Sequence, residues 1–135
     1  RRSGGVLVVF DVDDFKQVND RYGHLQGDVC LAEIAHCIKK AYAHCGYCYR
    51  IGGDEFCVLL KNADREAWCA QEFERLLALR REVVHCLPRV SLGSAPISGE
   101  DLLAVKDQAD REMYRCKKAR KAAAAAMERA ESGRP

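Results

Sequence analysis

The sequence shows no excess of charge of either sign: it holds 22 Lys and Arg residues against 20 Asp and Glu residues, for a formal net charge of +2. This balance argues against a strongly cationic nucleic-acid binder, and we expect no nucleic-acid partner. No apolar run approaches the roughly 20 residues that span a bilayer, and the first apolar stretch is too short for a signal peptide. We therefore expect a cytoplasmic domain that makes no membrane contact of its own.

The sequence also lacks internal repeats and any linker long enough to separate two domains. It has 135 residues, of which 48% are hydrophobic and 31% are charged. A chain of this length and composition builds one apolar core and is not disordered. We predict a single domain over residues 1–135.

Cysteine is abundant, with eight residues in the chain. Only Cys45 and Cys48 are spaced as CxxC, and no second pair follows at the spacing of a zinc ribbon. His36 and His44 lie nearby in the sequence, so a metal site is one interpretation of this segment. The favoured interpretation is that all the cysteines are free thiols that pack as small hydrophobic residues in a reducing compartment.

The patterning of apolar residues predicts an α+β fold in the order β-α-α-β-β-α-β-α. A hairpin amid helices indicates helices packed against a largely antiparallel sheet, and Gly52-Gly53 permits the positive φ of a tight hairpin turn. Asp28 is a candidate N-cap of the second helix. The expected strands are 6–10, 47–50, 56–60 and a region 83–95 interrupted at Pro88. The expected helices are 15–22, 28–45, 62–79 and one that opens at 98–100, extends through 122–126 and frays from Glu131.

Two acidic groups stand out. Asp11-Val12-Asp13-Asp14 follows the first strand directly, and Asp54-Glu55 lies at the tip of the hairpin. If the first strand lies beside the hairpin, both groups meet at one edge of the sheet. Clustered carboxylates repel one another unless a cation neutralises them, and oxygen ligands select a hard ion such as Mg²⁺, which acts together with substrate phosphates. The alternative is that the first group starts a helix and the second is a polar turn.

Several segments resemble one known family. Arg50-Ile51-Gly52-Gly53-Asp54-Glu55-Phe56 resembles the signature of the GGDEF family, the diguanylate cyclase domains. Residues 11–28 resemble its DxDxFKxxND…GHxxGD pattern, Ser91-Leu92-Gly93 resembles its SxG strand, and residues 109–117 resemble its AD…Y…K helix. The resemblance covers about residues 6–121, which leaves 122–135 as a helical extension and tail.

This resemblance implies a fold similar to polymerase palms and nucleotidyl cyclases. It also implies that two GTP molecules, one on each of two facing domains of a homodimer, condense to cyclic di-GMP with release of pyrophosphate. The implied cofactor is Mg²⁺, with Mn²⁺ as an alternative. By resemblance, Asp11, the backbone carbonyl of Val12 and Asp54 hold the metal. Glu55 is a second acidic ligand, and Asp54 accepts the proton of the 3′-hydroxyl, so the expected catalytic residues are Asp54 and Glu55.

The resemblance likewise implies where GTP binds. The implied substrate-binding residues are Asn19 and Asp28 for guanine, and Phe15, Lys16, Lys117 and Lys121 for the phosphates. The chemistry of Asp28 agrees with this assignment, because a carboxylate accepts hydrogen bonds from N1–H and the N2 amine of guanine. Adenine instead presents an acceptor at the corresponding ring nitrogen, so Asp28 favours GTP over ATP.

The sequence departs from the family pattern at three places. The product-binding RxxD motif is replaced at both ends, by Ala43 and Gly46, so we expect no product inhibition through this site. The family motif KxxGR ends here in Arg120-Lys121, and either residue is a candidate replacement for its arginine. The chain begins close to the first strand, so we expect an upstream helix and a sensor or dimerisation domain to be missing from it. These departures keep a second interpretation open, a catalytically weak or inactive GTP-binding regulatory module.

Overall fold

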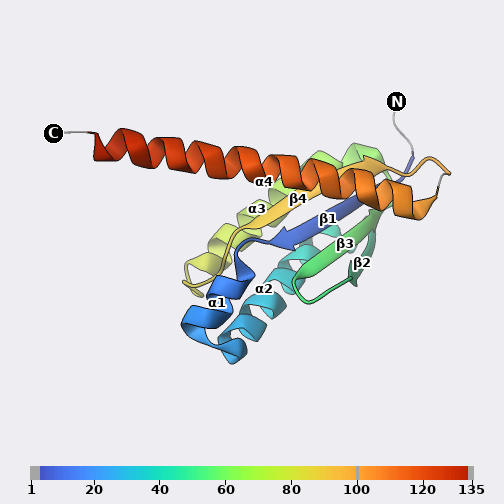
Figure 1. Ribbon diagram of the computed structural model, residues 1–135. Coiled ribbons are helices and arrows are strands. Elements are labelled where there is room, and N and C mark those ends of the chain that lie inside the picture. The colour runs from blue at the N-terminus through green and yellow to red at the C-terminus, as the bar shows by residue number, and fades with distance from the viewer. Residues whose placement is uncertain (1–3, 100, 134–135) are drawn as a thin grey trace.

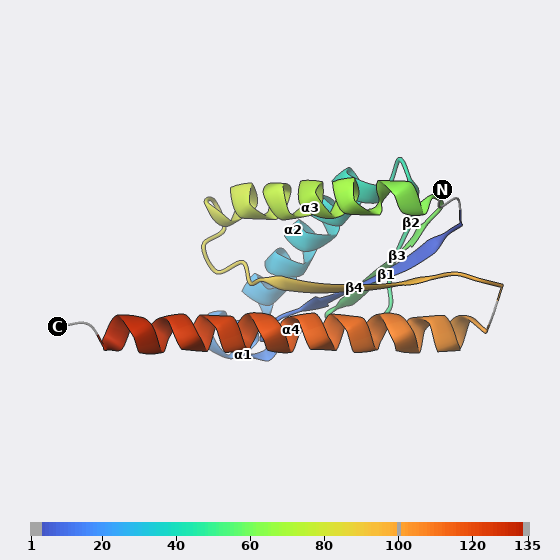
Figure 2. The ribbon, with the colours of Figure 1, turned by 90° about the horizontal axis from the view of Figure 1, so that it is seen from above.

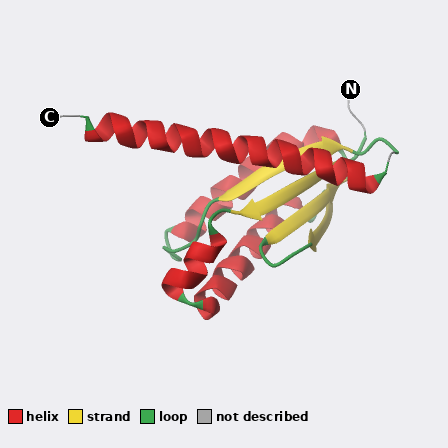
Figure 3. Ribbon diagram, viewed as in Figure 1, coloured by secondary structure: helices red, strands yellow, loops and turns green. Residues whose placement is uncertain are grey.

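Four antiparallel strands form a sheet that is covered by helices on both faces (Figures 1 and 3). The computed structural model describes residues 4–99 and 101–133. The elements in chain order are β1 (Val6–Val12), α1 (Phe15–Tyr22), α2 (His24–Tyr42), β2 (Gly46–Arg50), β3 (Glu55–Leu60), a 3₁₀ turn η1 (Ala63–Arg65), α3 (Glu66–Arg81), β4 (Val90–Pro96) and α4 (Leu102–Ser132). The predicted α+β class is therefore confirmed.

The sheet has the strand order β2-β3-β1-β4, which places the first strand at its centre. β1 pairs with the hairpin strand β3 on one side and with β4 on the other, and all pairings are antiparallel. A continuous run of branched apolar residues suits this central position, because both faces of β1 are covered. The expectation that the first strand lies beside the hairpin is confirmed.

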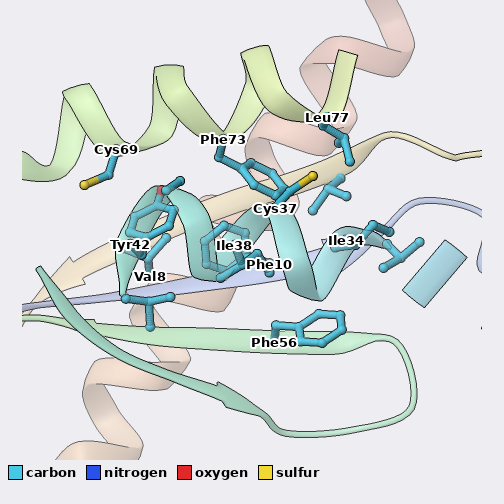
Figure 4. Close-up of a cluster of buried hydrophobic side chains, with 14 of the residues drawn as sticks. Val8, Phe10, Ile34, Cys37, Ile38, Tyr42, Phe56, Cys69, Phe73 and Leu77 are labelled. Atoms are coloured by element: carbon cyan, nitrogen blue, oxygen red, sulfur yellow. The ribbon is translucent and has the colours of Figure 1, made fainter. Parts of the chain in front are cut away.

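The first face of the sheet packs against α2 and α3, which lie together on one side of the strands in Figure 2. Phe10 of β1 has no exposed surface, and its ring centroid lies 5.3 Å from those of Tyr42 and Phe73 in edge-on contacts. The burial of β3 alternates along the strand, and Phe56, labelled in Figure 4, is buried on this face. Val58 is buried in the same core. Burial of these apolar and aromatic side chains is the main source of the fold's stability.

The second face packs against α4 alone, on the opposite side of the sheet (Figure 2). Its core is small and consists of Leu7, Val9, Ala95, Val105, Ala109 and Met113. Gly93 of β4 brings the helix close, since a Cβ at this position would overlap with the backbone of Ala109 and Met113. This close approach sets the charged side chains of α4 over the end of β1. No helix in the described residues is both long and apolar enough to cross a membrane.

The structure corrects the predicted starts of α2 and β4. α2 begins at His24 after Gly23, whose φ of 91° is open to glycine, so Asp28 lies inside the helix and is not its N-cap. The strand predicted over 83–95 begins only at Val90. Pro88 cannot donate to a strand ladder, and the Arg81 guanidinium instead holds the preceding loop through the carbonyl oxygens of Leu87 and Pro88.

The last helix also differs from the prediction at both ends. Asp101, rather than a residue of 98–100, is its N-cap and accepts a hydrogen bond from Leu103 N at 3.1 Å. Glu100 lies outside the described residues. The helix continues to Ser132, so Glu131 is helical and is not part of a frayed tail.

Candidate functional site

The two acidic groups meet at one edge of the sheet, as expected. Asp11 lies directly opposite Glu55 in the β1–β3 register, and Val12 N donates a hydrogen bond to Asp54 O at 3.1 Å. Because side chains alternate along a strand, Asp11 shares the face of Leu7 and Val9, which is the face covered by α4. The end of β1 and the hairpin tip therefore form one unit beneath α4.

The hairpin tip is held by backbone and side-chain hydrogen bonds. Ile51 N donates to Glu55 O at 2.9 Å, and the Arg50 guanidinium donates to the carbonyl oxygens of Gly52 and Gly53. Gly52 and Gly53 do not adopt the positive φ that glycine permits, since among the glycines of the described residues only Gly23 and Gly99 have one. A Cβ at Gly53 would meet nothing within 4 Å, and one at Gly52 would make only an ordinary contact with Glu55. The outer side of this turn is thus open to a ligand.

The carboxylates at this edge are crowded. Burial is the largest cause that raises the pKa of the Glu55 carboxyl, and Lys106, 3.7 Å away, opposes the shift. The remaining causes raise the pKa further, and they are the carboxylates of Asp110, Asp11 and Asp54. Like charges held together in this way favour the binding of a cation.

Asp110, part of the AD…Y…K motif, is a member of this cluster that was not expected at the site. It lines a hollow of about 450 Å³ together with Asp11 and Glu55. Its Oδ2 accepts a hydrogen bond from Lys106 at 2.7 Å, while its Oδ1 is buried and, in the described part of the chain, has no hydrogen-bond partner. The signal was present in the spacing, because positions 106, 110 and 117 of one helix lie on a single face.

The donor atoms at this edge are of the type that a hard divalent cation prefers, although among the described residues these carboxylates do not form a group with oxygen atoms all within 4.8 Å of one another. The edge offers oxygen atoms of Asp11, Asp54, Glu55 and Asp110, and no sulfur or nitrogen ligand is needed. The buried, unpaired Oδ1 of Asp110 and the raised pKa of Glu55 both indicate negative charge that an ion would compensate.

Lys117 of α4 reaches the same edge. Its Nζ lies 2.6 Å from Asp11 Oδ2 and 3.6 Å from Asp13 Oδ1. A cation held at this place by the close packing of α4 can neutralise part of the cluster or bind an anionic substrate beside it. Lys16, the other lysine expected to bind phosphate, is exposed in the first turn of α1.

Arg120 and Lys121 occupy different environments. Arg120 forms an ion pair with the buried Asp13 and donates to Ser91 Oγ at 2.6 Å, and Ser91 Oγ in turn donates to Asp13 Oδ1 at 2.7 Å. Burial lowers the pKa of Arg120. Lys121 lies 3.1 Å from Asp14 Oδ1, and both side chains are about half exposed. The structure therefore places Arg120 in an internal network and leaves Lys121 toward solvent.

The two residues expected to bind guanine flank Gly27. A Cβ at Gly27 would overlap with Asn19 Oδ1 and approach the Phe15 ring to 3.2 Å, so glycine lets α1 and α2 lie close together here. Asp28 is exposed on the next position of α2. It lines a hollow of about 520 Å³ between α2 and the hairpin strands, whose lining includes Arg50.

A third hollow, of about 540 Å³, lies between α1 and α4 beside the acidic edge. Its lining includes four basic side chains, Arg21, Arg89, Arg120 and Lys121, and the carboxylates of Asp13 and Asp14. Asp13 pairs with Arg120 and Asp14 with Lys121, so the carboxylates offset part of this positive charge.

Comparisons with known proteins agree with this geometry. The family model for the diguanylate cyclase, GGDEF domain matches residues 1–123. The cyclic di-GMP phosphodiesterase PdeR of Escherichia coli is 38% identical over 117 residues, which are 82% of this chain and 18% of that protein. The diguanylate cyclase DgcP of Pseudomonas aeruginosa is 35% identical over 130 residues, 87% of this chain and 19% of that protein. The chain therefore spans less than a fifth of the length of these two relatives.

Solved structures give the same result for the fold. An EAL/GGDEF domain protein from M. capsulatus has 32% identity and a TM-score of 0.74, over 87% of this chain and 80% of that one. The GGDEF domain of DgcB from Caulobacter crescentus, solved in complex with c-di-GMP, has 30% identity and a TM-score of 0.73, over 85% and 72%. The palm-like fold expected from the resemblance is confirmed.

Proposed function

The chain belongs to the GGDEF family of diguanylate cyclase domains, and from this membership we propose that it condenses two GTP molecules into cyclic di-GMP and releases pyrophosphate. The observation that carries the proposal is the complete acidic edge, where Asp11 lies opposite Glu55 and Asp54 is tied to β1 through Val12. Carboxylates gathered at one edge favour catalysis, because they supply both ligands for a cation and a proton acceptor.

In the proposed complex, Asn19 and Asp28 hydrogen-bond the guanine edge from the junction of α1 and α2. Lys16, Lys117 and Lys121 bind the triphosphate. The exposed environment of Lys121 supports this role, and the internal network of Arg120 argues against Arg120 as the replacement for the family arginine.

Asp11, the carbonyl of Val12, Asp54 and Glu55 would hold Mg²⁺ or Mn²⁺, which when bound polarises the phosphoryl oxygens and offsets their developing charge. Asp54 accepts the proton of the 3′-hydroxyl of one GTP. The oxygen then forms a bond to the α-phosphorus of the other GTP, and the bond to the β-phosphate oxygen breaks as pyrophosphate leaves. Two such transfers across a homodimer close the ring.

The test is a chromatographic assay of the products formed from GTP and Mg²⁺ at high protein concentration. The parent should make cyclic di-GMP, and Asp54→Ala should lower the rate by about 100-fold or more, since it removes a proton acceptor at the reacting hydroxyl. Asp107→Ala is the matched control, because Asp107 is an exposed carboxylate on α4 that pairs only with the exposed Arg111 among the described residues. ATP in place of GTP should give no product.

A second candidate function is a GTP-binding regulatory module without catalysis. The replacement of a bidentate arginine by the single charge of Lys121 favours it. If the parent is silent, the assay is repeated with a dimeric coiled coil fused before Arg1. Continued silence with GTP bound would support the regulatory module, whereas absence of GTP binding would contradict both functions.

A further inference from the structure

Two thiols and an imidazole gather at the end of the sheet opposite the acidic edge. His44 and Cys45 lie in the turn between α2 and β2, and Cys69 lies in the first turn of α3. One potential ligand atom from each residue lies within 4.8 Å of the other two, and no other His, Cys, Asp and Glu residues among 4–99 and 101–133 form such a group. This group differs from the one that the sequence suggested, because Cys48 and His36 are not in it.

The group is remote from the proposed catalytic site. Gly46, which follows Cys45, pairs with Leu60, five positions along β3 from Glu55. At about 3.3 Å per strand residue, this separation is roughly 17 Å. A ligand at His44, Cys45 and Cys69 would therefore leave the acidic edge free.

The two sulfur atoms are spaced for a shared metal ion. Cys69 Sγ lies 3.7 Å from Cys45 Sγ. A tetrahedral ion with metal–sulfur bonds of about 2.3 Å separates its two thiolates by roughly 3.8 Å. A disulfide would instead require about 2.05 Å. Without an ion, the same separation holds a hydrogen bond from the Cys69 thiol to Cys45 Sγ.

The cluster is held in place before any ligand binds. Cys45 N donates to Tyr42 O at 2.9 Å, and Cys45 O accepts from Lys61 N at 3.0 Å. Cys69 is fully buried at one end of the core cluster, next to Tyr42 (Figure 4). The exposed His44 lies edge-on to Trp68, with ring centroids 5.7 Å apart, which gives an ion an approach from solvent on the imidazole side.

We propose that His44, Cys45 and Cys69 bind one thiophilic divalent ion of the Zn²⁺ class, with water as the fourth ligand. Thiolate and imidazole are ligands of Zn²⁺ rather than of Mg²⁺, so this site and the acidic edge select different ions. Two thiolates and a neutral imidazole balance the charge of a divalent ion, which suits a half-buried place. The bound ion links α3 to the turn between α2 and β2.

Cys69 is buried beside Cys45, and burial together with the hydrogen bond to Cys45 raises the pKa of its thiol to about 12. An ion that takes Cys69 Sγ as a ligand therefore displaces the proton of that thiol, because the thiolate is the form that binds a metal.

The test titrates the reduced, metal-free chain with Co²⁺, in the absence of nucleotide, and follows the near-ultraviolet charge-transfer band of a thiolate–cobalt bond. Trp68 is the single tryptophan of the chain, so its fluorescence reports the same site independently. We expect one Co²⁺ per chain, quenching of Trp68, and displacement by Zn²⁺. Absence of the thiolate band would overturn the proposal.

Variants of the two turn residues separate this site from other thiols, and circular dichroism checks that each variant folds. Cys45→Ser should abolish the band, and His44→Ala should weaken binding at least about tenfold. Cys30→Ser is the matched control, because Cys30 and Cys86 form a second thiol pair with sulfurs 3.6 Å apart. A band that persists in Cys45→Ser, depends on Cys30, or is indifferent to His44 would contradict the site.

Discussion

Two glutamates on opposite sides of the sheet experience opposite electrostatic environments. Glu33 of α2 accepts hydrogen bonds from Arg80 of α3 at 2.9 and 2.8 Å, and these bonds lower the pKa of its carboxyl. Glu55, under α4, has a raised pKa because it is partly buried and has three carboxylates nearby, which Lys106 offsets only in part. Glu33 thus has the two hydrogen bonds of one arginine, whereas Glu55 shares Lys106 with Asp110 and lies among further carboxylates.

The apolar cores on the two faces of the sheet also differ. The core between the sheet and α2 and α3 contains the aromatic side chains of Phe10, Tyr42 and Phe73, while the core under α4 is small and mostly aliphatic. The two sides therefore differ in what they contribute: one side holds the larger aromatic core, and the other holds the crowded acidic edge. The following predictions test that difference, beginning with the largest effect.

Phe73→Ala should reduce the free energy of unfolding by about 3–5 kcal/mol, because the ring is fully buried and its removal leaves a cavity beside Phe10. Urea denaturation followed by circular dichroism measures the loss. Leu79→Ala on the same helix is the control, since Leu79 is 49% exposed and should cost less than about 1 kcal/mol. If Phe73→Ala lowers the free energy of unfolding by no more than Leu79→Ala does, this side of the sheet does not carry most of the stability.

Arg120→Met should cost about 1–3 kcal/mol of stability, less than the loss of a core aromatic. Asp13 is buried and would lose its guanidinium partner, but it keeps the hydroxyl of Ser91 and the more distant Lys117. Lys121→Met is the matched control, because its pair with Asp14 is exposed and contributes less than about 0.5 kcal/mol.

The effects on activity should have the opposite order to the effects on stability: Lys121→Met should lower activity more than Arg120→Met. Lys121→Met should lower the rate of cyclic di-GMP formation in the product assay while the urea midpoint hardly changes. If Lys121→Met is fully active and Arg120→Met is inactive though folded, Arg120 is the phosphate ligand and the assignment above is wrong.

The smallest effects come from Glu33→Gln and Glu55→Gln, and they should have opposite signs. Glu33→Gln should lower stability at neutral pH by no more than about 1 kcal/mol, since Arg80 is 41% exposed and the pair is screened. Glu55→Gln, in buffer without divalent cations, should raise stability by no more than about 1 kcal/mol, because it removes a charge from the crowded edge.

The pH dependence of the Glu33 variant follows from the sign of the shift. A lowered pKa means that the ionised carboxylate stabilises the fold above its ordinary pKa of 4.5, and that this contribution is lost as pH falls through the lowered value. The stability difference between parent and Glu33→Gln should therefore disappear in acid. A deficit that persists below that range would show that the variant disturbs packing rather than charge.

Much of the fold was predictable from local patterns. A branched apolar run predicts a central strand, and a hairpin placed after two helices predicts an antiparallel sheet, as β1, β2 and β3 confirm. The predicted starts of α2 and β4 were wrong, because an apolar pattern marks which residues are buried but not where backbone hydrogen bonding begins. Gly23, with its positive φ, precedes the start of α2, and Pro88, which cannot donate a backbone hydrogen bond, precedes the start of β4.

The candidate site, like the fold, was only partly predictable from the sequence. Asp11 and Glu55 could be placed together from the sequence, since adjacent antiparallel strands align their ends. Asp110 was not assigned, because its contribution depends on how close α4 packs, which Gly93 permits. The roles of Arg120 and Lys121 stayed open for the same reason, as neighbours on one helix point in directions that only the packed helix defines.

The sequence by itself determined the central strand, the hairpin, the acidic motif and the family, because these depend on residues near one another in the chain. Only the tertiary structure decided that Cys69 of α3 joins Cys45 rather than Cys48, and that Arg120 is paired inside while Lys121 faces solvent. The physical reason is that periodicity specifies which face of an element is buried. What lies across that face is set by the packing of elements that are distant in sequence.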